Sequence, residues 1–186
     1  MKAIEIERKF LVRDDSWRAC ADQPCVLQQA YLGSDQNSIR VRLIDGRSAR
    51  LTIKFRSPGL AREEFEYEIP VEEARDLLLH AGQVIEKTRY RVLHDGRSWE
   101  VDVFAGAYQG LTLAEIEMAS EDDRFNLPQW LGREVTGEMR YSNRGMAAAP
   151  RTQPAAPQSF TTVQFASGLK SLIAAARSSV AAPRSR

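Results

Sequence analysis

Lysine and arginine side chains recur at every second position in several segments of this 186-residue sequence. These positions are Arg40 and Arg42, then Lys54, then Lys87, Arg89 and Arg91. Residues two apart share one face of a β-strand, so each segment would present a row of cations. Because lysine and arginine bind phosphate oxygens, arginine often through two hydrogen bonds, such rows suit a polyanion.

Acidic side chains follow the same spacing in other segments. The rows are Glu5 and Glu7, Glu64 with Glu66 and Glu68, Glu100 with Asp102, and Glu115 with Glu117. Carboxylates two apart on a strand suit a hard divalent cation such as Mg²⁺, which keeps several waters and bridges to phosphate. Lys9 continues the first acidic row, so acids and a base would meet on one face.

The charges are segregated by strand rather than mixed, as they usually are on a soluble surface. One interpretation makes the charged faces the solvated outside of a sandwich around an apolar core. The other places them inside a barrel, with the apolar faces outward under helices and the C-terminal segment. Like charges on one strand face repel unless something between them is neutralised, which favours a charged lumen that holds a polyanion with its metal ions.

Strand periodicity predicts the elements that must position these charges. Eight strands are expected at residues 3–12, 26–33, 38–45, 48–56, 62–70, 84–94, 97–105 and 111–119. Asp45-Gly46 and Asp95-Gly96 between neighbouring strands are typical of tight reversals. The fold class is therefore α+β and mainly antiparallel β, as an eight-stranded tunnel-like β-barrel with a charged lumen and a few flanking helices.

Helices are predicted at few places. Residues 71–81 have early acids and a late run of leucines, and a second short helix is expected to begin near Ser120. Residues 1–145 form the predicted domain. The remaining segment, 146–186, contains an Ala/Pro-rich linker at 146–159 and a short amphipathic helix at 167–179.

Composition excludes several classes. The 26 basic and 25 acidic residues nearly balance, which argues against a nucleic-acid binder or a membrane-surface binder. Cys20 and Cys25 are too few for a zinc finger or a disulfide scaffold, and we interpret them as free thiols. No glycine-rich phosphate loop, signal peptide or membrane-spanning stretch is recognisable, so we expect a cytoplasmic protein.

The order of these motifs resembles the CYTH, or triphosphate tunnel metalloenzyme, family. Glu5-Ile6-Glu7-Arg8-Lys9 resembles its ExExK signature. The later matching segments are Arg40-Val41-Arg42, Leu51-Thr52-Ile53-Lys54, Glu64 with Glu66, Lys87-Thr88-Arg89-Tyr90, Glu100-Val101-Asp102, Glu115-Ile116-Glu117, Glu134-Val135-Thr136 and Tyr141-Ser142-Asn143. The resemblance covers about residues 1–145 and is closest to the short bacterial triphosphatases. Met139 departs from the family's pattern, which often has a basic residue there.

The resemblance implies roles for the charged residues. Phosphate oxygens would be bound by Arg40, Arg42, Lys54, Lys87, Arg89 and Arg91. Mg²⁺ or Mn²⁺ would be held by Glu5, Glu7, Asp102, Glu115 and Glu117. Lys9 would lie near the scissile bond, with Tyr31 pairing with its ammonium group. Glu64, Glu66 and Glu100 would orient the basic residues through ion pairs.

The expected function is metal-dependent hydrolysis of tripolyphosphate to pyrophosphate and phosphate. The alternatives are a thiamine or nucleoside triphosphatase, a class IV adenylyl cyclase, and a non-catalytic polyphosphate-binding module. An organic substrate would need a pocket at the tunnel mouth. The candidates for lining such a pocket are Trp99, Phe104 and Tyr108. The expected partner is a small-molecule triphosphate, with neither nucleic acid nor membrane, and a homodimer is left open.

Overall fold

The computed structural model describes residues 2–32, 37–56 and 62–149 of the chain. Residues 1–150 form one unit and residues 151–186 a second, and all described residues belong to the first. The predicted helix at 167–179 and most of the predicted linker lie outside the described residues. The structural account therefore concerns the first unit alone.

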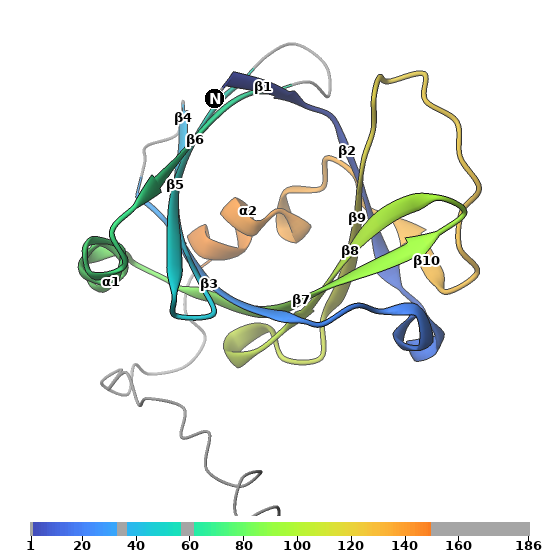
Figure 1. The fold of residues 1–186 in the computed structure, drawn as a ribbon, viewed down its shortest axis with the longest axis horizontal. Helices are drawn as coiled ribbons and strands as arrows, with labels where there is room; N and C mark the ends of the chain where they lie inside the picture. Colours follow the sequence, from blue (N-terminus) through green and yellow to red (C-terminus); the bar gives the residue numbers. More distant parts are fainter. Residues whose placement is uncertain (1, 33–36, 57–61, 150–186) are drawn as a thin grey trace, which may run out of the picture. The chain divides into compact units, whose positions relative to one another are not determined.

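The described residues form ten strands in one antiparallel sheet (Figure 1). They are β1 (Lys2–Glu5), β2 (Glu7–Val12), β3 (Cys25–Tyr31), β4 (Asn37–Ile44), β5 (Ser48–Arg56), β6 (Arg62–Ile69), β7 (Ile85–His94), β8 (Arg97–Phe104), β9 (Thr112–Glu117) and β10 (Leu131–Glu134). Their hydrogen-bonded order is β1-β6-β5-β4-β3-β7-β8-β9-β2-β10. The predicted fold class, mainly antiparallel β with few helices, is confirmed.

The sheet itself is open, and the chain completes the ring seen in Figure 1. β1 pairs with β6 and β2 pairs with β9, while only Ile6 separates β1 from β2. The backbone carbonyl of Ile6 accepts a hydrogen bond of 2.8 Å from the N–H of Met118. The single strand expected at 3–12 is thus split because its two halves pair with different strands.

The other predicted strands are found, and their ends are shifted by at most two residues. β10 was not expected, because its four residues show no apolar alternation. Asp45-Gly46 and Asp95-Gly96 form the expected reversals, with φ of 51° and 65° in the first and 50° and 74° in the second. Left-handed backbone at both central residues matches the turn to the twist of the strands it joins.

The described part of the chain contains two α-helices. α1 (Val71–His80) confirms the helix expected at 71–81. α2 (Asn143–Ala148) includes residues 146–148, where a linker was predicted, so the folded domain continues past residue 145. Short 3₁₀ helices, none of them predicted, are η1 (Asp15–Cys20), η2 (Gly106–Tyr108) and η3 (Met139–Tyr141).

The helix expected near Ser120 is wrong, because residues 119–122 form bends and turns. The carboxylate of Asp123 accepts a hydrogen bond of 3.2 Å from the N–H of Ala119 and binds both terminal nitrogens of Arg97, at 2.8 and 2.7 Å. Because Asp123 accepts hydrogen bonds from the preceding backbone and from a distant arginine, its contacts compete with helix formation.

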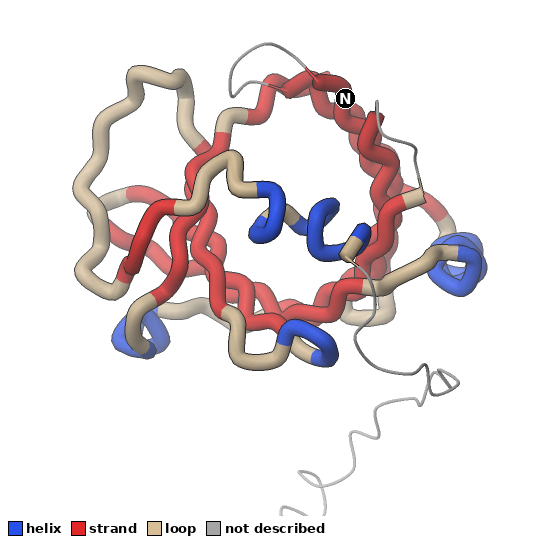
Figure 2. The backbone as a smooth tube through the Cα atoms, turned by 180° about the vertical axis from the view of Figure 1, so that it is seen from behind, coloured by secondary structure: helices blue, strands red, loops and turns tan. Residues whose placement is uncertain are grey.

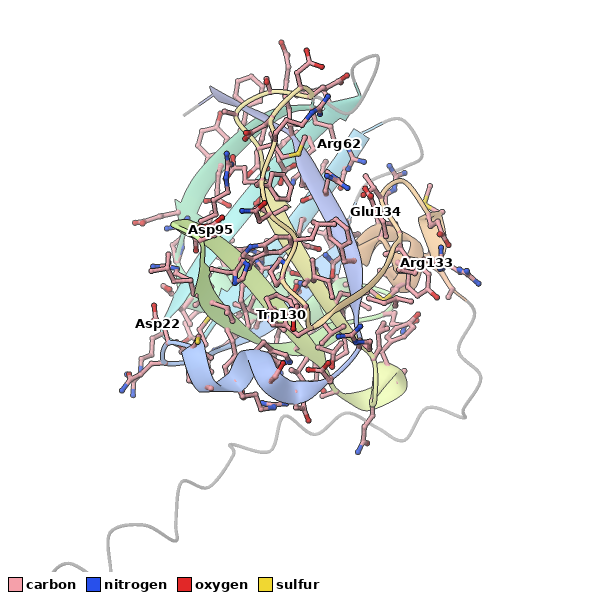
Figure 3. All side chains as sticks on the ribbon, turned by 90° about the vertical axis from the view of Figure 1, so that its right-hand side faces the viewer. Asp22, Arg62, Asp95, Trp130, Arg133 and Glu134 are labelled. Carbon is pink, nitrogen blue, oxygen red and sulfur yellow. The ribbon has the colours of Figure 1, made fainter. Side chains whose placement is uncertain are left out.

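Apolar outer faces of the strands pack under these helices and loops. One cluster lies between α1 and the strands β3 to β5, with Ala30, Val41 and Leu43 against Leu78. Another covers β2, β7, β8 and β9 and is centred on Trp99, which is fully buried. The rings of Phe10, Phe125 and Trp130 surround Trp99 edge-on at centroid distances of 5.7–5.8 Å; Figure 3 labels Trp130.

α2 lies within the ring of strands in both Figure 1 and Figure 2. Its residue Met146 is buried among the inward side chains of Ile85, Phe104 and Leu113. One end of the ring is therefore filled by an apolar layer. No helix among the described residues is long and apolar enough to cross a lipid bilayer.

Candidate active site

Strand register determines which side chains share the interior of the ring. Directly opposite residues of neighbouring strands point to the same side. Tyr31 lies opposite Arg40, Arg89 opposite Asp102, and Lys9 opposite Glu115. Register and contacts place the following predicted residues on this inner face: Glu5, Glu7, Lys9, Tyr31, Arg40, Arg42, Lys54, Lys87, Arg89, Arg91, Asp102, Glu115 and Glu117.

Asp102 is the centre of the most deeply buried group. Its two carboxylate oxygens accept hydrogen bonds of 2.7 Å from Nε and Nη2 of Arg89, and one also binds the ammonium of Lys87. The side chains of Asp102 and Lys87 are fully inaccessible. Burial lowers the pKa of Lys87 to about 8 against the opposing charge of Asp102. The carboxylate of Asp102 is thus occupied in holding two cations.

Lys9 lies beside this group. Its Nζ is 2.8 Å from Oε1 of Glu115 and 3.8 Å from Oε1 of Glu7. Burial lowers the pKa of Lys9, but the charges of Glu115 and Glu7 outweigh it, and the pKa is raised. Lys9 is therefore a permanent cation at neutral pH, suited to stabilising negative charge rather than to accepting a proton.

Tyr31 is close enough to help raise the pKa of Lys9, yet no hydrogen bond joins the two side chains. The phenolic oxygen of Tyr31 instead accepts from Nε2 of Gln29 at 3.5 Å. The pairing of Tyr31 with Lys9 therefore stays a prediction from the sequence.

The strand that carries Lys9 is fixed by the closing motif of the domain. The backbone N–H of Lys9 donates to Oγ1 of Thr136 at 3.1 Å. On the outer side, Arg8 binds both carboxylate oxygens of Glu134, at 2.9 and 2.6 Å; Glu134 is labelled in Figure 3. Residues 134–136 therefore hold β2 in place.

Arg40 and Arg42 occupy the wall formed by β3, β4 and β5. Nη2 of Arg40 donates to Oγ1 of Thr52 at 3.0 Å and lies 3.7 Å from Glu66. The Nε of Arg40 is buried and has no hydrogen-bond partner among the described residues. Burial, together with the positive charges of Arg40 and Arg89, lowers the pKa of Arg42 to about 10. Both features favour an added anion at this wall.

Three further cations extend the inner face. Lys54 pairs with Glu5 and, at 2.8 Å, with Glu64. Arg50 pairs with Glu66, so Glu64 and Glu66 orient bases as expected. Arg91 lies opposite Glu100 in register and is exposed.

Sequence reasoning gave no individual role to several polar residues of the interior. They are Gln29, Arg50, Thr52 and Asn143. Arg50 and Thr52 share the strand parity of Lys54, which could have identified them. Asn143 accepts a hydrogen bond of 3.2 Å from Lys87, a contact that depends on α2 entering the ring.

The carboxylates were expected to hold a metal. No group of three or more acidic, histidine or cysteine side chains in the described residues is arranged around one ion position. Asp102 and Glu115 are instead paired with cations. Glu7 has a longer contact with Lys9, at 3.8 Å, and burial followed by the neighbouring charges of Glu115 and Glu5 raises its pKa. A bound cation would relieve that repulsion, so the donors around Glu7 fit a hard divalent ion.

The aromatic candidates for an organic-substrate pocket lie elsewhere. Trp99 is in the outer core, and Phe104 belongs to the apolar layer at the filled end. Tyr108 packs there too, donating its hydroxyl to the carbonyl of Met146 at 2.6 Å. A surface hollow of about 410 Å³ contains no predicted site residue and is lined by His94, Asp95, Arg97, Arg124, Phe125 and Asn126.

Comparison with known proteins agrees with this geometry. Residues 3–149 match the CYTH domain. The chain is 43% identical over 149 residues to the inorganic triphosphatase of Acetivibrio thermocellus, covering 78% of this chain and 94% of that protein. It is 42% identical to the inorganic triphosphatase of Nitrosomonas europaea, over 77% of this chain and 96% of that one.

A solved structure of an inorganic triphosphatase has a similar fold. The crystal structure of the inorganic triphosphatase NE1496 superimposes with a TM-score of 0.58 at 36% identity, covering 78% of this chain and 95% of that chain. The matched segment contains the inner-face residues from Glu5 to Glu117 and the closing motif at 134–136. The chain belongs to the CYTH domain family.

Proposed function

We propose that this chain hydrolyses inorganic triphosphate, with water as the acceptor, to pyrophosphate and phosphate. The observation that carries the proposal is the inner face itself, where cations from β2, β4, β5 and β7 share one side of the sheet and an apolar layer fills one end of the ring. The unpartnered Nε of Arg40 supports an anion there, because a buried N–H donor without a partner is costly. Both relatives are named inorganic triphosphatases, which agrees with the proposed reaction.

In this mechanism the chain positions the substrate and stabilises charge. Arg40, Arg42, Lys54, Lys87 and Arg89 hold phosphate oxygens, with Arg91 at the exposed end of the row. Lys9 stabilises the charge that develops at the scissile phosphoryl group, and Tyr31 lies beside it. Because phosphoryl transfer depends on positioning and electrostatic stabilisation, no covalent intermediate is required.

A divalent metal, Mg²⁺ or Mn²⁺, completes the proposal. Triphosphatases of the CYTH family are generally metal-dependent. Glu5, Glu7, Glu115 and Glu117 would hold the ion, since Glu7 faces Glu117 in register and Glu115 lies nearby. The ion would neutralise phosphate charge and polarise the reacting phosphoryl group. Asp102, whose oxygens serve Lys87 and Arg89, would orient those cations instead.

The experiment is phosphate release from tripolyphosphate, ATP and thiamine triphosphate, each with Mg²⁺, with Mn²⁺ and with chelator. We expect metal-dependent release from tripolyphosphate and little from the organic triphosphates. The positions of Trp99, Phe104 and Tyr108, outside the charged interior, support this order. A cyclic nucleotide from ATP, or tight binding without release, would favour the cyclase or the binding module.

The variant Glu7→Gln tests whether Glu7 is a metal ligand. Loss of one carboxylate should raise the Mn²⁺ concentration needed for half-maximal activity by about tenfold. Glu73→Gln, on the exposed side of α1, removes the same charge outside the site and should change nothing. An equal metal requirement in both variants would count against the ligand role of Glu7. A cytoplasmic location and a homodimer stay predictions from the sequence.

A further inference from the structure

Gln29 is a fully buried amide between two residues of the site. The register of β3 and β4 places it directly opposite Arg42, and Tyr31 follows two residues later on the same face. The charge pattern of the sequence assigned it no role, because a glutamine carries no charge. Its position nevertheless lets it touch both neighbours.

The two ends of the side-chain amide have different partners. Oε1 of Gln29 accepts a hydrogen bond of 3.0 Å from Nε of Arg42. Nε2 of Gln29 lies 3.5 Å from the hydroxyl oxygen of Tyr31. Since an unpaired buried amide oxygen is costly, the bond to the guanidinium fixes how the amide is turned. Gln29 thus links the phosphate-binding wall to the residue beside Lys9.

Arg42 differs from most of the other cations of the interior. Lys9, Arg40, Lys54, Lys87 and Arg89 each form an ion pair with a described carboxylate. Arg42 forms none with the described residues, and its hydrogen bond is to the neutral oxygen of Gln29. A carboxylate at that place would fix Arg42 equally well but would also neutralise it.

We propose that Gln29 is a positioning residue, which holds Arg42 with an uncharged oxygen so that the guanidinium keeps its full charge for a substrate phosphate. The inference rests on the proposed triphosphatase function and adds to it the reason that an amide, and not an acid, stands at this position. Through its other end, the same amide holds Tyr31 near Lys9.

The test is Gln29→Glu, which keeps the shape of the side chain and adds one negative charge against Arg42. The KM for tripolyphosphate should rise about tenfold or more, while kcat falls by a smaller factor. The variant should resist urea at least as well as the wild type, because the new carboxylate pairs with a cation. A loss of affinity without a loss of stability separates this role from a merely structural one.

Gln28→Glu is the matched control. Gln28 is the next residue of β3 and faces outward, where its amide donates to Glu86 at 3.0 Å. It receives the same charge change outside the site, so its KM should equal that of the wild type. A second control is Arg42→Gln, in which the further change Gln29→Glu should raise the KM by a clearly smaller factor, since the cation that it mainly neutralises is gone.

Three results would overturn the inference. These are a KM for Gln29→Glu within twofold of the wild type, an equal rise in Gln28→Glu, and a full further rise in the Arg42→Gln background. Calorimetric titration with tripolyphosphate separates this failure from failure of the proposed function. Binding without hydrolysis in the wild type would count against the function alone, and the affinities of the variants would still decide the role of Gln29. Absence of binding would overturn both.

Discussion

The two walls of the charged interior treat their cations differently. On the wall formed by β2, β7, β8 and β9, Lys9, Lys87 and Arg89 are joined to Glu115 and Asp102 by continuous ion pairs. On the wall formed by β3, β4 and β5, Arg40, Arg50 and Lys54 also pair with acids, but two arginines donate to neutral side chains as well. Arg40 donates to Thr52 and Arg42 donates to Gln29.

This difference explains how one fold can stabilise many buried cations and still bind an anion. Buried charges without partners are costly, so the first wall is stabilised by its acids. On the second wall Arg42 has no ion pair with a described residue, and burial followed by the charges of Arg40 and Arg89 lowers its pKa. We therefore expect the first wall to govern stability and the reacting centre, and the second to govern affinity for phosphate.

The largest expected effect is on stability, from Asp102→Asn. Removing this charge leaves Lys87 buried without its counter-ion and weakens the hold on Arg89, so the free energy of unfolding should fall by about 3–5 kcal/mol. Urea denaturation measures it. Asp22→Asn is the control, since Asp22 is exposed (Figure 3). Equal stabilities of the two variants would show that the first wall does not depend on its acid.

Lys9→Ala should have the next largest effect, on turnover. Removing a fixed cation from the reacting centre is expected to lower kcat about 10²–10³-fold, with a smaller change in KM. Steady-state phosphate release from tripolyphosphate measures both constants. Arg47→Ala, in the exposed turn after β4, is the control and should match the wild type. An unchanged kcat would remove Lys9 from the chemistry.

Arg42→Gln compares the walls directly. Loss of this cation should raise the KM for tripolyphosphate about 10–30-fold, while the free energy of unfolding falls by only about 1–2 kcal/mol because Gln29 loses its partner. Arg89→Gln removes the same charge from the paired wall and should cost about 3 kcal/mol of stability. If both variants lose equal stability, the distinction between the walls fails.

The smallest expected effect lies outside the interior, at Asp123. Hydrogen bonds from Arg97 and from the N–H of Ala119 lower the pKa of Asp123 in the folded state. Its carboxylate therefore stabilises the fold above the unfolded-state pKa, and this contribution is lost as the pH falls through the lower folded-state value. The urea midpoint of Asp123→Asn should lie below that of the wild type at pH 7, and the gap should close below about pH 4.

Asp122→Asn, the adjacent exposed acid, serves as the control for that measurement. Its urea midpoint should follow the wild type at both pH values. A gap for Asp123→Asn that persists unchanged at low pH would mean that shape, and not charge, explains the effect.

Much of the fold followed from local pattern. Alternating residues such as Arg40 and Arg42 against Val41 identified β4, and Asp45-Gly46 identified the turn after it. The chain from Ser120 to Glu134 was harder to predict. There Asp123 binds Arg97, which lies 26 residues away in the sequence. A helix prediction that rests on neighbouring residues does not include so distant a partner.

For the candidate site, the sequence alone determined which residue types alternate along each strand, and hence the rows of acids and bases. Strand geometry fixes that arrangement within each segment. Only the tertiary structure decided that the charged faces turn inward, that Asp102 serves Lys87 and Arg89, and that α2 fills one end. Pairing between strands far apart in the chain sets these contacts. A cation that is paired with carboxylates stabilises the fold, whereas a cation without such a partner stays available to a ligand.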